Sequence, residues 1–120
     1  MSIAARAVTV AELIPRVESL RRQGYRFVTI TCVAAAESGA ELIYHFDRAL
    51  ALLHLRLMVD PGGAPPSIVP VYAAAWLVEN EIQDQFGLRF AGLAPDYRRT
   101  LLLDGEDMAP PLRGDGREGG

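Results

Sequence analysis

Three segments between residues 25 and 59 have β-strand patterns and are joined by short connections. Apolar and polar side chains alternate most clearly in the last of them, 52–59. One face of that segment is entirely apolar, with Leu53, Leu55, Leu57 and Val59. The other two segments, 25–33 and 42–46, are rich in aromatic and β-branched residues, as strands are. Successive strands with such short connections predict an antiparallel meander.

A helix is predicted before the strands. Thr9 and Glu12 have the spacing of a capping box, and apolar residues follow at helical spacing until Gly24, where the helix is expected to stop. Pro15 lacks a backbone donor. We therefore expect the regular helix to begin near residue 13, or to kink there.

A second helix is predicted after the strands. A loop rich in proline and glycine spans 60–66, and residues 67–69 could add a short strand. The helix is then expected over 71–86, with Gly87 ending it. The residues at helical spacing that form its apolar stripe are Ala75, Val78, Ile82 and Phe86.

These patterns predict an α+β fold in which two helices cover one face of an antiparallel sheet of three or four strands. We expect residues 1–104 to form this single domain. Residues 105–120 are expected to be an extended or disordered C-terminal arm, because their glycine-rich end has nothing to bury. Alternation in the first strand places Val28, Ile30 and Cys32 on one of its faces.

Composition excludes several classes of protein. The 120 residues carry a net charge of −3, which argues against binding to nucleic acid. A single cysteine, Cys32, cannot form an internal disulfide or a self-contained iron–sulfur site. No apolar run approaches the ~20 residues that span a bilayer, and the first residues lack the apolar region of a signal peptide. We therefore expect a cytoplasmic chain that could still sit at a membrane through partners.

Three carboxylates gather on the second predicted helix. Glu81 and Asp84 are three residues apart and share a face opposite the apolar stripe, while Glu79 is expected on its flank. They could form a solvated acidic face, an acid–base pair in a cleft, part of a metal site or a docking surface. A docking surface would pair them with arginines of a partner, or with Arg98 and Arg99 folding back.

His45 and His54 are the only histidines. If the hairpin turns at Ala49 and Leu50, they fall opposite each other, away from the core-facing leucines. Two histidines alone make a weak metal site, because zinc usually needs three or four protein ligands. Surface histidines on the sheet are the expected interpretation. Neither they nor Cys32 form a catalytic constellation.

The segment from Trp76 to Gly92, called the signature segment below, resembles the signature of the respiratory-chain NADH dehydrogenase 30-kDa subunit family. This family comprises the 30-kDa subunit of complex I, together with its homologues in energy-converting [NiFe] hydrogenases and formate hydrogenlyases. The shared pattern is Glu79-x-Glu81-x-x-Asp84-x-Phe86-Gly87-Leu88-Arg89-Phe90-x-Gly92. The continuation Pro95-Asp96-Tyr97-Arg98-Arg99 and the later Pro111-Leu112-Arg113 also fit its C-terminal arm.

The chain departs from the family at three places. Asn80 stands where the family usually has arginine, Leu93 where it has histidine or lysine, and Ala94 is an apparent insertion. These departures and the short chain favour a hydrogenase-type homologue over a true NADH:quinone oxidoreductase subunit.

The resemblance implies a non-catalytic structural or assembly subunit that binds no cofactor or metal. Such a subunit packs against the large subunit, which carries the [NiFe] centre or its quinone-site descendant, and lies near the iron–sulfur small subunit. It would reach the inner face of the cell membrane only through its complex. The residues expected to contact partners are Glu79, Glu81, Asp84, Phe86, Arg89, Asp96, Arg98, Arg99 and Arg113.

Two alternatives remain open. A small α+β enzyme would use Glu81 and Asp84 as acid and base, and would need a pocket at those carboxylates. A stand-alone ligand-sensing domain would bind a small molecule between protomers.

Overall fold

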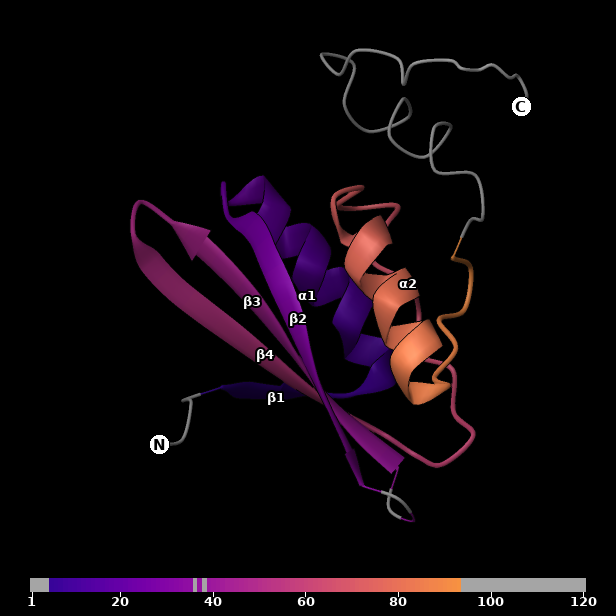
Figure 1. The fold of residues 1–120 in the computed structure, drawn as a ribbon. Coiled ribbons are helices and arrows are strands. Elements are labelled where there is room, and N and C mark those ends of the chain that lie inside the picture. Colours follow the sequence, from indigo (N-terminus) through magenta and orange to yellow (C-terminus); the bar gives the residue numbers. More distant parts are fainter. Residues whose placement is uncertain (1–4, 36, 38, 94–120) are drawn as a thin grey trace, which may run out of the picture.

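The computed structural model describes residues 5–35, 37 and 39–93. Figure 1 shows two helices beside a strongly twisted sheet. The elements in chain order are β1 (Arg6–Val8), α1 (Val10–Arg22), β2 (Arg26–Ala35), β3 (Gly39–Arg48), β4 (Ala51–Val59) and α2 (Ala75–Phe86). This is the α+β fold that the sequence predicts.

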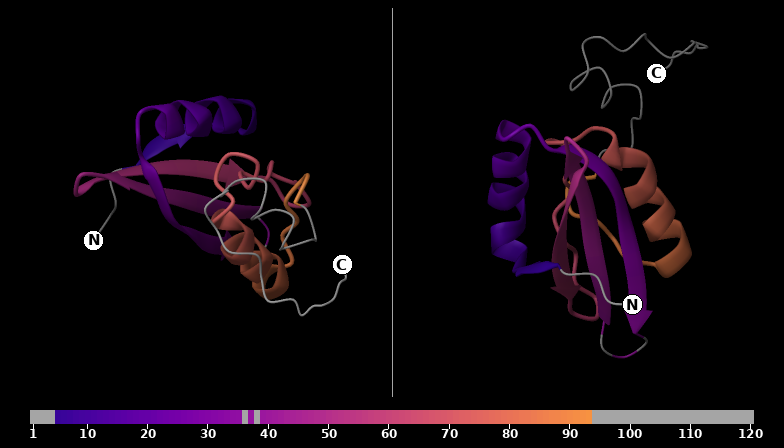
Figure 2. Two further views of the ribbon diagram at one scale, coloured as in Figure 1. Left: turned by 90° about the horizontal axis from the view of Figure 1, so that it is seen from above. Right: turned by 90° about the vertical axis from the view of Figure 1, so that its left-hand side faces the viewer.

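The sheet has the strand order β1-β4-β3-β2. β2, β3 and β4 form the predicted antiparallel meander. β1 is a fourth strand that pairs with β4 in parallel, so the sheet is mixed rather than purely antiparallel. Sequence patterns do not reveal β1, because it is three residues long and only Val8 in it is buried. The long β3–β4 hairpin extends away from α2 (Figures 1 and 2).

One face of the sheet forms the core. Register places core residues of neighbouring strands side by side, for example Ile30 with Tyr44 and Tyr44 with Leu55. Both helices contribute to this same cluster, α1 through Leu13, Val17 and Leu20 and α2 through Ala75 and Ile82. The expected core face of 52–59 is confirmed, with Leu55, Leu57 and Val59 buried and Leu53 packed against the cluster.

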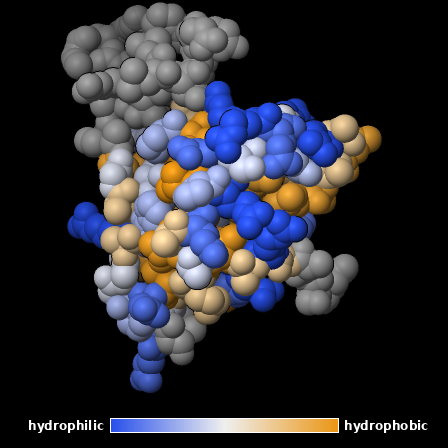
Figure 3. Space-filling view, turned by 180° about the vertical axis from the view of Figure 1, so that it is seen from behind, coloured by the Kyte–Doolittle hydropathy of each residue, from blue (hydrophilic) through white to orange (hydrophobic). Residues whose placement is uncertain are grey.

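The opposite face of the sheet is open. Its exposed apolar side chains are Val28, Val33, Leu52 and Met58. Two ion pairs cross this face, from Arg26 to Asp47 at 2.9 Å and from Arg56 to Glu41 at 2.7 Å. Figure 3, which views the molecule from behind, likewise shows apolar residues scattered among hydrophilic ones.

Val28 is on this open face because of a β-bulge. The register of β2 against β3 shifts between Phe27 and Thr29, so that Phe27 pairs with Phe46 and Thr29 with His45. A bulge inserts one residue and reverses the alternation on one side of it. The prediction that Val28 shares a face with Ile30 and Cys32 is therefore wrong, and Phe27 takes its place.

The capping box is confirmed and fixes the start of α1. The Thr9 hydroxyl accepts a hydrogen bond from the Glu12 backbone, and the Glu12 carboxylate accepts one from the Thr9 backbone. The helix therefore begins at Val10, and the expectation of a start near residue 13 is wrong. Pro15 lies exposed inside the helix.

The segment before α2 is less regular than predicted. Residues 67–69 form no strand, although Pro66 makes an isolated bridge with Ala91. Turns occupy 69–74, and α2 begins at Ala75 rather than at residue 71. Gly87 ends α2 as predicted, in the left-handed conformation with φ of 71°. The expected arm over 105–120 lies outside the described residues.

Candidate docking surface on the signature segment

The first carboxylate of the signature segment faces the core. Glu79 is fully buried. One of its oxygens accepts a hydrogen bond from the Ser67 hydroxyl at 2.6 Å, and the other accepts one from the Ile68 backbone N–H at 2.9 Å. Its expected place on the flank of the helix is wrong, because Ala75, Glu79 and Ile82 form one inward stripe at helical spacing.

Burial raises the pKa of Glu79 to about 7, although the hydrogen bonds from Ser67 and Ile68 act in the opposite direction. Tyr44 lies in the same core, and its hydroxyl is buried without a hydrogen-bond partner among the described residues. Burial, and then the charge of Glu79, raise the pKa of this hydroxyl as well. Glu79 therefore gives local order to the segment, and its carboxylate is already occupied within the chain.

The other two carboxylates point outward. Glu81 and Asp84 are exposed, as predicted. Leu77 precedes them on the same stripe and is 58% exposed. Leu77, Glu81 and Asp84 are spaced i, i+4 and i+7, so they form one outer face of α2. This outer face is solvated, and neither carboxylate lines the hollow at the end of the helix.

The end of the signature segment is tied to the body by backbone hydrogen bonds. The Ala91 N–H donates to the Pro65 carbonyl at 2.8 Å, and the Ser67 N–H donates to the Ala91 carbonyl at 2.9 Å. The Gln83 side chain accepts from the Phe90 N–H at 2.9 Å. With Phe90 buried, these contacts hold the segment in a fixed orientation after Gly87.

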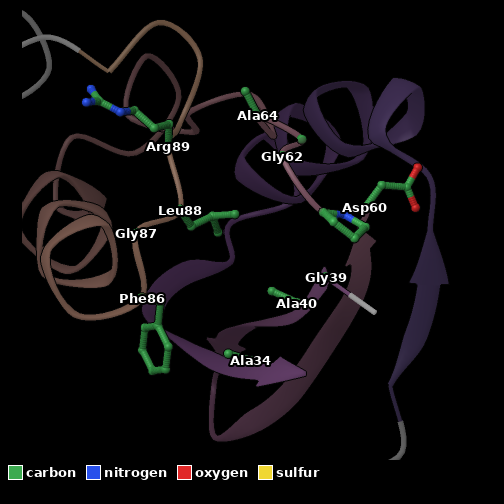
Figure 4. A pocket seen from close by; sticks show the side chains of 12 residues that line it. Ala34, Gly39, Ala40, Asp60, Gly62, Ala64, Phe86, Gly87, Leu88 and Arg89 are labelled. Carbon is green, nitrogen blue, oxygen red and sulfur yellow. The ribbon is translucent and has the colours of Figure 1, made fainter. Parts of the chain in front are cut away.

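A hollow of about 340 Å³ lies beside the end of α2. Figure 4 shows Phe86 and Asp60 on opposite sides of it, with Leu88 between them. Phe86 is 42% exposed although the sequence places it on the apolar stripe. Arg89 also lines the hollow and is exposed. The expected contact residues Asp96, Arg98, Arg99 and Arg113 lie outside the described residues.

The two histidines lie opposite each other, as predicted. Ala49 and Leu50 form the turn, and His45 pairs with His54 across β3 and β4. Their Nδ1 atoms are 2.7 Å apart. Within the described part of the chain, no group of three or more histidine, cysteine, aspartate or glutamate residues could hold a metal ion. No helix in that part is long and apolar enough to cross a membrane.

Residues 7–118 match the family model described as respiratory-chain NADH dehydrogenase, 30 Kd subunit. The chain belongs to this 30-kDa subunit family. The match extends over the fold and the signature segment together, and it confirms the resemblance seen in the sequence.

The curated relatives are subunits of NADH-quinone oxidoreductase, all designated by the letter C. The chain is 38% identical over 101 residues to the one from Rhodobacter capsulatus, covering 77% of this chain and 49% of that protein. It is 35% identical over 81 residues to a form numbered 2 from Rhizobium etli, covering 62% of this chain and 43% of the relative. This 30-kDa family member thus spans about half the length of the curated relatives it matches.

A solved structure shares the fold. A trypsin-resistant fragment of Nqo5, residues 1–134, superposes with a TM-score of 0.66 at 14% identity, covering 73% of this chain and 78% of the fragment. At that identity the likeness concerns the fold alone.

Sequence reasoning on this 30-kDa family member missed Ser67 and Ile68, the partners of Glu79. They lie in an irregular segment between two prolines, Pro66 and Pro70, where no helical or strand period marks an inward residue. Asn80, which stands where the family usually has arginine, donates a hydrogen bond to the Trp76 carbonyl at 2.8 Å. This departure from the family pattern is therefore satisfied within α2.

Proposed function

We propose that this chain is a non-catalytic structural subunit of a membrane-associated electron-transfer complex, and that it docks on the large subunit. The observation that carries this proposal is the orientation of the signature helix. Glu79 fixes one face of α2 to the core, while Leu77, Glu81 and Asp84 lie on its outer face. A rigid helix that exposes an apolar side chain between carboxylates suits recognition of an arginine-containing partner surface.

The partners that we propose are the large subunit, of the quinone-site or [NiFe] type, and the iron–sulfur small subunit. The names of the curated relatives support a complex of the NADH-quinone oxidoreductase type over a hydrogenase. The chain would then lie at the inner face of the cell membrane through its complex. Phe86, Arg89 and the residues Asp96, Arg98, Arg99 and Arg113 would extend the contact beyond the outer face of α2.

An enzyme that uses Glu81 and Asp84 is a weaker candidate. Acid–base catalysis needs a cleft that excludes water and holds the two groups near a substrate. Both carboxylates instead lie exposed on a helix. A binding module for a small molecule also finds less support, since the hollow beside Phe86 contains none of the three signature carboxylates.

The proposal is tested by co-purification from the native host. We expect the double variant Leu77→Arg/Glu81→Arg to reduce recovery of the large subunit by about tenfold or more, which corresponds to ~1.4 kcal/mol. Glu18→Arg on α1 is the matched control, since Glu18 is an exposed helical carboxylate far from the signature segment in the sequence. It should leave recovery unchanged.

Folding is checked separately by thermal melting of each purified variant. Recovery of the complex at wild-type yield with the double variant would refute docking through α2. The type of complex is read from the captured subunits: flavin- and NADH-binding subunits indicate NADH:quinone oxidoreductase, and a large subunit with paired CxxC motifs indicates a hydrogenase.

A further inference from the structure

Two histidine side chains contact each other on the open face of the sheet. The turn at Ala49 and Leu50 has two residues, so Arg48 and Ala51 form the hydrogen-bonded pair that closes it. Hydrogen-bonded and non-hydrogen-bonded pairs alternate along an antiparallel ladder. His45 and His54 therefore fall at a non-hydrogen-bonded position, where opposing side chains come closest.

The two Nδ1 atoms point at each other. They are 2.7 Å apart, and the rings meet edge to face with 4.9 Å between their centroids and 78° between their planes. A contact this short needs one donor and one acceptor, so a single proton lies between the two nitrogen atoms. Both lone pairs would face the same point if that proton left.

Thr31 fixes the other side of the His45 ring. Its hydroxyl lies 2.8 Å from Nε2 of His45. When that hydroxyl accepts the Nε2–H, the Nδ1 lone pair of His45 is free to bind. Histidines that bind metals generally donate their second ring N–H in this way. Burial, and then the neighbouring His54, lower the pKa of His45, which favours the neutral ring that metals require.

We propose that His45 and His54 bind one divalent transition-metal ion through their Nδ1 atoms, with the remaining coordination positions open on the exposed sheet face. The His54 proton would move to its own Nε2 when the ion binds. Because the described residues offer no third histidine, cysteine or carboxylate for this site, the chain supplies two ligands and the ion is exchangeable.

Geometry favours Cu²⁺ or Ni²⁺ over Zn²⁺. With metal–nitrogen bonds of about 2.0 Å, two ligands are ~3.3 Å apart on a tetrahedral ion but only ~2.9 Å apart at neighbouring corners of a square. The observed separation of 2.7 Å is closer to the second value. Square-planar or tetragonal coordination by nitrogen and oxygen is typical of Cu²⁺ and Ni²⁺.

Calorimetric titration of the full chain, purified without a polyhistidine tag, tests the site with Ni²⁺ and Cu²⁺. We expect one ion per chain above any binding by the free amino terminus, and that ion should be lost in His54→Gln. Thr31→Val should weaken binding by about 10- to 100-fold, because it removes the partner of the His45 ring.

Thr29→Val is the matched control. Thr29 lies on the same exposed face and pairs directly with His45 in the ladder, so its variant should bind as tightly as the wild type. Thermal melting without metal checks that each variant folds. Absence of binding in the wild type, or equal binding in His54→Gln, would overturn the proposal. Equal weakening in both threonine variants would overturn the role of Thr31.

Discussion

The Glu79 carboxylate lies inside the core and accepts a hydrogen bond of 2.6 Å from the Ser67 hydroxyl. Ser67 also accepts a hydrogen bond from the Val69 N–H at 3.1 Å, and Ile68 donates to the second Glu79 oxygen. Three backbone and side-chain groups from the irregular segment are thus satisfied by two side chains. This network joins α2 to residues 67–69, which have no regular secondary structure to hold them.

The first prediction concerns pH. Glu79 ionises near pH 4.5 in the unfolded chain and near pH 7 in the folded chain. Between these values the folded state retains a proton that the unfolded state has lost, so stability falls as the pH rises from 4.5 to 7. The total loss is about 3 kcal/mol. It should be visible in urea denaturation at a series of pH values.

Glu79→Gln should remove this dependence. A glutamine has the shape and the neutrality of the protonated acid, and it can still pair with Ser67 and Ile68. The variant should therefore be more stable than the wild type above pH 7. Glu81→Gln changes an exposed carboxylate on the same helix and should keep the wild-type profile. An unchanged pH profile in Glu79→Gln would show that this carboxyl does not cause the effect.

Why the sequence reveals the histidine pair but not this network follows from local periodicity. A two-residue turn and a period of two suffice to place His45 opposite His54. Glu79 turns inward because a distant serine and a backbone N–H receive it there, and no periodic pattern encodes that. A helical period that starts from apolar residues alone therefore assigns Glu79 to the flank.

The β-bulge and β1 escaped prediction for related reasons. Val28 interrupts the alternation of β2 by one position, yet a β-branched residue fits either face of a strand. Only the partner register with His45 and Phe46 decides which face it takes. Likewise, Arg6–Val8 becomes a strand because β4 offers a free edge. Both features depend on tertiary pairing rather than on local sequence.

The second prediction concerns the close approach of Gly39 to β4. A Cβ atom at Gly39 would collide with the backbone carbonyl of Val59. Gly62 has a similarly positive φ, 77° against 93°, but nothing lies within 4 Å of its Cβ position. Gly62→Ala should therefore cost only the conformational strain, about 1 kcal/mol.

Gly39→Ala should cost that strain and the collision as well, so that the protein loses several kcal/mol or fails to fold. Because both glycines are left-handed, the difference between the two variants isolates the backbone collision. Denaturation midpoints of the two purified variants measure it. Equal losses would mean that β4 moves aside at little cost.

The third prediction concerns the turn that sets the histidine register. Ala49 and Leu50 both have positive φ values, 48° and 72°, a conformation that costs non-glycine residues about 1–2 kcal/mol. Leu50 is 95% exposed and buries almost nothing. Leu50→Gly should therefore stabilise the protein by about 1 kcal/mol, since glycine suits the second position of this turn.

Leu52→Gly is the contrasting variant, because Leu52 is also exposed but lies within β4. Glycine in a strand loses conformational freedom on folding, so this variant should be destabilised by about 1 kcal/mol. Urea denaturation should thus give shifts of opposite sign for two exposed leucines two residues apart. If both variants lost stability, the turn would not be the strained element, and the register of His45 with His54 would have to be maintained by the ladder alone.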